Sequence, residues 1–115
     1  MYSLSIEKRL KNADDFSSVF SFRRVKSGMY FRIHIKPNQL NHSRLGLIVG
    51  KKIHKRANKR NYMKRVIREL FRLNQALWLP HDIIVRSIKP FTNQDFLKIC
   101  QEFLWLTSNL KQLNR

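Results

Sequence analysis

The clearest pattern in the chain is an alternation of apolar and polar side chains over residues 30–36. Successive side chains of a β-strand point to opposite faces, so the alternation predicts a strand with one apolar face and one basic, aromatic face. A turn-forming segment at 37–42 leads to a second apolar run at 44–49, and the two runs predict a β-hairpin. The apolar face consists of Phe31, Ile33 and Ile35, and the basic face of Tyr30, Arg32, His34 and Lys36.

Helical patterns surround these strands. Asn12 is a favourable N-cap for a first helix, with two aspartates in its first turn. An amphipathic helix is expected over residues 60–77, because Pro80 prevents it from continuing further. The apolar run at 82–87 predicts a mostly buried strand, and Thr92 begins a last helix with a pattern close to a capping box.

The predicted order is helix, strand, strand, helix, strand, helix. This order is typical of an α/β (α+β) two-layer sandwich, in which about three helices pack on a small mixed sheet. No repeat or low-complexity linker divides the sequence, so residues 1–115 are expected to form a single domain.

The net charge of the chain bears on its binding partner rather than on its fold. The chain has 24 Lys and Arg residues against 7 Asp and Glu residues, a formal net charge of +17. So many like charges repel one another, which indicates a polyanionic partner: nucleic acid first, with an anionic membrane surface as the alternative. The sequence lacks a transmembrane-length apolar run and an apolar signal-peptide region, so we expect a cytoplasmic protein. Its single cysteine, Cys100, excludes a disulfide framework and a cysteine-based zinc site.

The helix predicted at 60–77 gathers its cations on one side. At 3.6 residues per turn these polar side chains fall within an arc of about 140°, opposite an apolar face. A solvated charged face is the alternative interpretation, but such a face normally mixes the two signs of charge. Arginine suits RNA because its planar guanidinium binds phosphate oxygens in pairs and stacks on bases. The polar face consists of Arg60, Asn61, Lys64, Arg65, Arg68 and Arg72.

This helix also carries a family resemblance. Residues 60–72 read Arg-Asn-Tyr-Met-Lys-Arg-Val-Ile-Arg-Glu-Leu-Phe-Arg. They resemble the signature Arg-Asn-x-x-Lys-Arg-x-x-Arg-Glu-x-Phe-Arg of the bacterial ribonuclease P protein component. Segments 10–20, 43–47, 51–52 and 80–85 are similar to further parts of that family, in the same order.

The resemblance implies a fold with a left-handed βαβ crossover, an exception to the usual handedness. It also implies a subunit that assists a catalytic RNA in removing the 5′ leader from precursor tRNA. The RNA, with Mg²⁺ held mainly by the RNA, would perform the hydrolysis, with no protein side chain catalytic and no small-molecule cofactor. Contacts to the catalytic RNA, or to a metal ion near it, would come from Arg60, Asn61, Lys64, Arg65 and Arg68, with Arg72, Lys51 and Lys52 as further RNA contacts.

The resemblance further implies that the leader lies in a cleft between the first helix and the sheet. Aromatic side chains interleaved with cations suit single-stranded RNA, because bases stack while the backbone charge is neutralised. The leader cleft would be lined by Phe16, Phe20, Tyr30, Arg32, His34 and Lys36. For Phe16 and Phe20, ordinary core packing is the alternative.

Three other functions compete with this hypothesis. An autonomous nuclease would cluster carboxylates around metal ions, whereas the seven acids are scattered over several predicted elements. A membrane-surface protein would have to expose the apolar helix face that the pattern assigns to the core. A structural, ribosomal-type RNA-binding protein needs the same phosphate contacts, so composition alone leaves it open.

Overall fold

The computed structural model describes residues 4–110. Within this range four strands form one mixed sheet in the order β1-β2-β4-β3. β4 pairs antiparallel with β2 and parallel with β3, and β1 pairs antiparallel with β2. The strands are β1 (Arg24–Ser27), β2 (Phe31–Pro37), β3 (Arg44–Ile48) and β4 (His81–Ser87), and the α-helices are α1 (Ala13–Phe22), α2 (Ala57–Asn74) and α3 (Phe96–Leu106).

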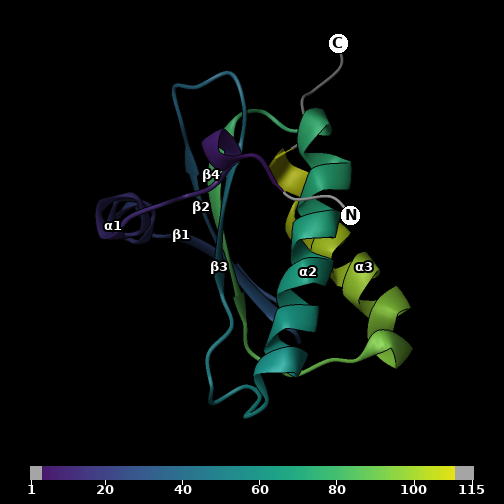
Figure 1. Cartoon of the computed structure of the whole chain (residues 1–115). Helices are drawn as coiled ribbons and strands as arrows, with labels where there is room; N and C mark the ends of the chain where they lie inside the picture. The colour runs from purple at the N-terminus through teal and green to yellow at the C-terminus, as the bar shows by residue number, and fades with distance from the viewer. Residues whose placement is uncertain (1–3, 111–115) are drawn as a thin grey trace.

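The mixed sheet with three helices is confirmed. In Figure 1 the sheet is seen nearly edge-on, with α1 on one side and α2 and α3 on the other. α1 therefore adds a third, smaller layer to the sandwich. α2 connects the parallel neighbours β3 and β4, which makes the βαβ unit that the family resemblance implies.

The predicted hairpin between the runs at 30–36 and 44–49 is wrong. β4 lies between β2 and β3 and pairs with both. The reason is burial: Ile83, Ile84 and Val85 are all 0% exposed, so β4 is apolar on both faces and takes the central position. β2 instead forms a hairpin with β1, a strand whose sequence shows no apolar alternation.

The helix ends follow local chemistry. The Asn12 side chain accepts a hydrogen bond from the Asp15 backbone N–H, which confirms the predicted N-cap of α1. Thr92 and Asp95 form the predicted capping box, although a turn of 3₁₀-helix precedes α3 there. α2 begins at Ala57, three residues before the predicted start, and ends at Asn74, where a 3₁₀ turn continues to the predicted end.

Two clusters of buried side chains hold the layers together. The main core lies between the sheet and the pair α2 and α3, and Phe31, Phe71 and Phe103 are its largest fully buried side chains. A smaller cluster lies under α1 on the opposite face of the sheet. It consists of Leu10, Val19 and Ile84, with Phe16, Phe20 and Ile48 packed against them.

Candidate RNA-binding surfaces

The cationic face of α2 is largely as predicted. Met63, Ile67 and Leu70 are buried against the sheet, so the opposite side of the helix faces solvent. We call the residues Asn61, Lys64, Arg65 and Arg68 the α2 face; Lys64 is half-buried and the other three are exposed.

Arg60 differs from its neighbours on this helix. Its Nη1 atom donates to the backbone carbonyls of His54 and Lys55, at 2.7 and 2.8 Å. The side chain is half-buried and ties the first turn of α2 to the end of the preceding loop. That loop carries Lys51 and Lys52, so Arg60 helps to place them.

Arg72 is also engaged within the protein. Its guanidinium forms an ion pair with Glu69, three residues earlier on α2. The hydrogen bond from Arg72 is the main reason why the pKa of Glu69 lies below its ordinary value. The scarcity of acidic residues on this helix predicts that its cations are not neutralised within it, and for Arg72 this prediction is wrong.

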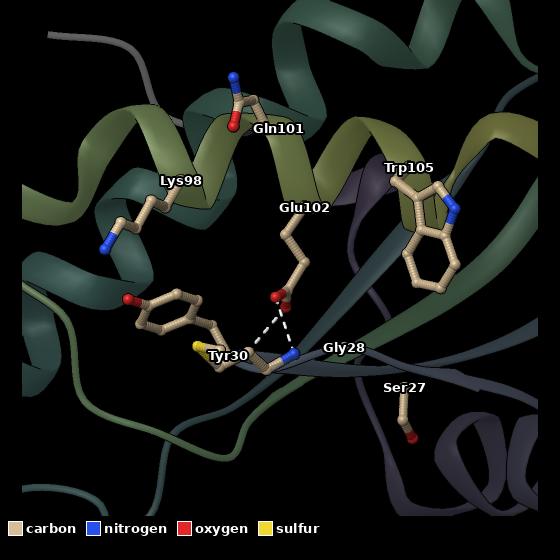
Figure 2. A pocket seen from close by; sticks show the side chains of 8 residues that line it. Ser27, Gly28, Tyr30, Lys98, Gln101, Glu102 and Trp105 are labelled. Atoms are coloured by element: carbon tan, nitrogen blue, oxygen red, sulfur yellow. Dashed lines mark hydrogen bonds between the residues drawn. The ribbon is translucent and has the colours of Figure 1, made fainter.

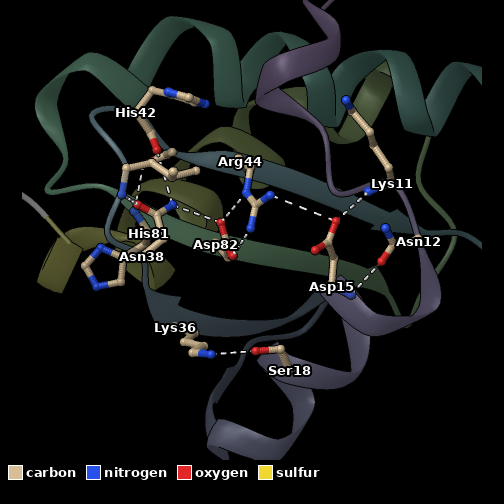
Figure 3. Close-up of polar contacts among 12 residues, drawn as sticks. Lys11, Asn12, Asp15, Ser18, Lys36, Asn38, His42, Arg44, His81 and Asp82 are labelled. Carbon is tan, nitrogen blue, oxygen red and sulfur yellow. Dashed lines mark hydrogen bonds and ion pairs between the residues drawn. The ribbon is translucent and has the colours of Figure 1, made fainter.

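The predicted leader cleft lies on the α1 side of the sheet. Arg32, His34 and Lys36 all project there from β2, as the alternation predicts. The His34 ring meets the Phe20 ring edge-on, with 4.8 Å between centroids. Lys36 Nζ donates to Ser18 Oγ of α1, so Lys36 joins the helix to the sheet (Figure 3).

Phe16 and Phe20 of α1 are half-buried. Both pack in the smaller core cluster, which supports the packing alternative without burying them completely. Phe16 fits only because position 46 is a glycine: a Cβ atom on Gly46 would lie 2.7 Å from Phe16 Cζ.

Tyr30 does not belong to this cleft. Its side chain is 5% exposed, lies in the main core and meets Phe91 edge-on at 6.3 Å, while its hydroxyl donates to Asp95 at 3.4 Å. Its pKa is raised, first by burial and then by the charge of Asp95. The physical reason is that β2 begins at Phe31, so Tyr30 lies in the turn before it and does not follow the strand's alternation.

A groove of about 380 Å³ opens on the same side of the sheet, next to the cleft, and shares Arg32 with it. We call it the basic groove, because four cations line it. Arg32 and Arg86 are register partners on β2 and β4, and Ile48 continues the row on β3. The lining residues that matter here are Arg32, Arg86, Lys51, Lys52 and Ile48.

Arg86 is the site residue that sequence analysis missed. Its Nε atom is buried without a hydrogen-bond partner, and its guanidinium lies 6.0 Å from the Phe20 ring centroid. His34 Nε2 is likewise buried and unpartnered. Burial, followed by the charges of Arg86 and Arg32, lowers the pKa of His34. The available signal was a single cation within the apolar run at 82–87.

The acidic side chains within residues 4–110 are mostly occupied by structural contacts. Asp82 accepts from Arg44 at 2.8 and 2.6 Å and from the Asn38 amide at 2.9 Å, as Figure 3 shows. Asp15 lies 3.9 Å from the same arginine. In the described part of the chain, no group of three or more His, Cys, Asp or Glu side chains is placed to hold a metal ion.

None of the helices described is long and apolar enough to cross a membrane.

Comparisons with known proteins agree on one family. The family model described as Ribonuclease P matches residues 4–111. The ribonuclease P protein component of Azoarcus sp. is 46% identical over 104 residues, which cover 90% of this chain and 87% of that protein. The protein of the same name from Chromobacterium violaceum is 50% identical over 86 residues, covering 75% and 71%. The solved Staphylococcus aureus RNase P protein superimposes with a TM-score of 0.79 at 30% identity, over 93% of this chain and 98% of that one.

Proposed function

The chain belongs to the ribonuclease P protein family, and from this premise we propose which of its surfaces bind RNA and how they assist cleavage. As the protein subunit of ribonuclease P, it assists the catalytic RNA in the endonucleolytic removal of the 5′ leader from precursor tRNA. We also propose that the protein acts in the cytoplasm. Two surfaces divide the binding: the basic groove takes the leader and the α2 face takes the catalytic RNA.

The observation that carries the leader site is the row of Arg32 and Arg86. Two arginines directly opposite each other on neighbouring strands repel, and the buried Arg86 Nε lacks an acceptor. A phosphate between them would accept hydrogen bonds from the two guanidinium groups and screen the repulsion. The Phe20 ring lies beside this row and Lys51 and Lys52 lie at its other side, an arrangement that suits a single strand of RNA.

The α2 face suits the larger RNA. Its cations share one side of an 18-residue helix, and the Arg65 guanidinium lies 5.9 Å from the centroid of the Tyr62 ring. Asn61 offers an amide to a 2′-hydroxyl or a base edge. If the three cations of this face and the four of the basic groove together neutralise about six phosphates, the log–log slope of affinity against salt concentration is about −4 to −5.

The chemistry of cleavage belongs to the RNA partner in this proposal. Mg²⁺, held mainly by the RNA, would activate the attacking water and stabilise the leaving oxygen. The protein's own carboxylates support the fold instead: Asp82 holds Arg44, Asp95 accepts from the Thr92 N–H in the capping box before α3, and Glu102 accepts three backbone N–H groups. The side chains of the basic groove bind and orient the leader.

Cleavage of precursor tRNA by a bacterial ribonuclease P RNA at low Mg²⁺, with and without this protein, tests the proposal. We expect the protein to restore cleavage at the correct 5′ position and to be inert alone. Tight RNA binding that leaves cleavage unchanged would instead favour a structural, ribosomal-type role. Binding that needs anionic lipid and survives competition by RNA would favour the membrane-surface alternative.

A further inference from the structure

The row of residues at this end of the sheet extends past the basic groove. Ile48, Arg86 and Arg32 are in register across β3, β4 and β2, and Ser27 of β1 is the next partner. Arg32 Nε donates to Ser27 Oγ at 3.2 Å. A strand of RNA that crosses the basic groove from β3 therefore arrives at β1, which is an edge of the sheet.

A second groove begins at that edge. It has a volume of about 510 Å³, lies between the turn after β1 and helix α3, and is shown in Figure 2. We call it the α3 groove. Its lining includes Ser27, Met29, Lys98, Gln101, Glu102 and Trp105.

Trp105 is the distinctive side chain of the α3 groove. Its indole is 56% exposed, whereas Trp78 is buried in the main core at 3%. Lys26 Nζ lies 4.2 Å from the Trp105 ring centroid and donates to the Trp105 backbone carbonyl at 3.1 Å. An exposed indole beside a lysine side chain combines a stacking surface for a base with positive charge for its phosphate.

The acid in this groove is already compensated. Glu102 points from α3 to the turn, where its carboxylate accepts from the backbone N–H groups of Met29, Tyr30 and Phe31 at 2.7 to 2.8 Å (Figure 2). A Cβ atom on Gly28 would lie 2.4 Å from the Glu102 side chain, so the glycine permits this contact. The contact holds the turn against α3 and leaves Lys98 as the cation that lines the groove, with Lys26 beside the Trp105 ring.

We propose that the α3 groove is a distal binding site for single-stranded RNA, in which a leader base stacks on Trp105. The inference rests on the proposed function, because the leader reaches Trp105 by way of the basic groove. From β3 to β1 the path crosses three inter-strand spacings, about 14 Å. Lys51 and Lys52 lie between β3 and α2, whose face takes the catalytic RNA in the proposed function, so the leader enters at β3 and its nucleotides in the α3 groove lie farther from the cleavage site.

A ladder of precursor tRNAs, whose leaders lengthen by one nucleotide at a time, tests the proposal with the reconstituted holoenzyme. For the unsubstituted protein we expect affinity to rise twice with leader length: first when the leader fills the basic groove, and again when it reaches Trp105. Trp105→Ala removes the second rise and weakens binding of the long leaders roughly 5- to 150-fold, the range for stacking one base on an aromatic ring. Trp105→Phe keeps a ring and retains most of the second rise.

Leu97→Ala is the matched control, because Leu97 is 76% exposed on the same helix and does not line the groove. It should preserve both rises, and thermal unfolding should show that all three variants are folded. A second rise that survives Trp105→Ala, or a ladder with only the first rise, would overturn the inference while leaving the proposed function intact. A ladder without the first rise would instead count against the leader site in the basic groove.

Tryptophan fluorescence gives an independent readout. Stacking quenches the exposed indole, while the buried Trp78 is shielded from the RNA. Long leaders should therefore quench the emission of the unsubstituted protein more than short ones do. The same difference in Trp105→Phe would show that the quenching comes from elsewhere and contradict stacking on Trp105.

Discussion

Replacing Arg86 with methionine separates stability from RNA binding. Methionine keeps an unbranched chain over Phe20 and removes the guanidinium, whose Nε atom is buried without a partner. Arg32 lies directly opposite in the register, so the substitution also removes a repulsion between neighbouring strands. We expect the free energy of unfolding in the absence of RNA to stay the same or to rise by up to about 1 kcal/mol.

Leader binding, in contrast to stability, should weaken. A hydrogen bond from arginine to a phosphate contributes about 1.5–3 kcal/mol, so the affinity for the leader should fall roughly 10- to 150-fold. Loss of one phosphate contact to a single strand should also make the salt slope shallower by about 0.7. Arg24→Met is the charge-matched control, since Arg24 is an exposed residue of β1 that does not line the basic groove.

The same variant changes the response to acid. In the folded protein, burial and then the charges of Arg86 and Arg32 lower the pKa of His34. The unfolded chain therefore binds a proton at higher pH than the folded protein does, and stability is lost as the pH falls through the unfolded value of about 6.5. Without Arg86 the pKa of His34 should rise towards its ordinary value, so less stability is lost; NMR titration of His34 measures the shift.

Two results would refute this reasoning. One is equal weakening of leader binding by Arg86→Met and Arg24→Met, which would mean that only the overall charge matters. The other is a fall in the free energy of unfolding of more than about 1 kcal/mol, which would make Arg86 a stabilising residue of the sheet. Urea denaturation and leader-binding titrations on the two variants decide both points.

The remaining predictions concern packing and loop placement. Gly46→Ala should destabilise the protein by about 1–3 kcal/mol in urea denaturation, because the new Cβ would lie 2.7 Å from Phe16 Cζ. Gly50→Ala adds a Cβ atom that meets nothing within 4 Å, so it should leave the stability unchanged. Equal losses of stability in the two variants would contradict the packing argument. Arg60→Ala should speed hydrogen exchange in residues 51–55 of the isolated protein, because it removes two hydrogen bonds to loop carbonyls. Unchanged exchange would leave Arg60 without a role in placing that loop.

Local patterns in the sequence predicted most of the elements. The two faces of α2 follow from a 3.6-residue period, and the caps at Asn12 and Thr92 from side chains that bond their own first turns. The alternation in β2 correctly separates Phe31, Ile33 and Ile35 from Arg32, His34 and Lys36. Each of these features depends on residues a few positions apart, which is why a linear pattern can reveal them.

The family resemblance also follows from the sequence, because the residues of the signature are close together in one helix and do not depend on how the rest of the chain packs. The role of each cation within that helix cannot be read from the sequence. Arg60 and Arg72 match the signature as well as Arg65 and Arg68 do. Only the folded protein shows that Arg60 binds loop carbonyls and that Arg72 pairs with Glu69.

The tertiary structure alone decided the strand order and, with it, the binding surfaces. Pairing β4 between β2 and β3 places Arg86 opposite Arg32, although 54 positions separate them in the sequence. The turn before β2 carries Tyr30 into the main core, and packing of α3 against that turn leaves Trp105 exposed beside Lys26. Such juxtapositions depend on which strands share hydrogen bonds and which faces are buried. These are properties of the whole chain's packing, so a periodicity read over a few residues does not contain them.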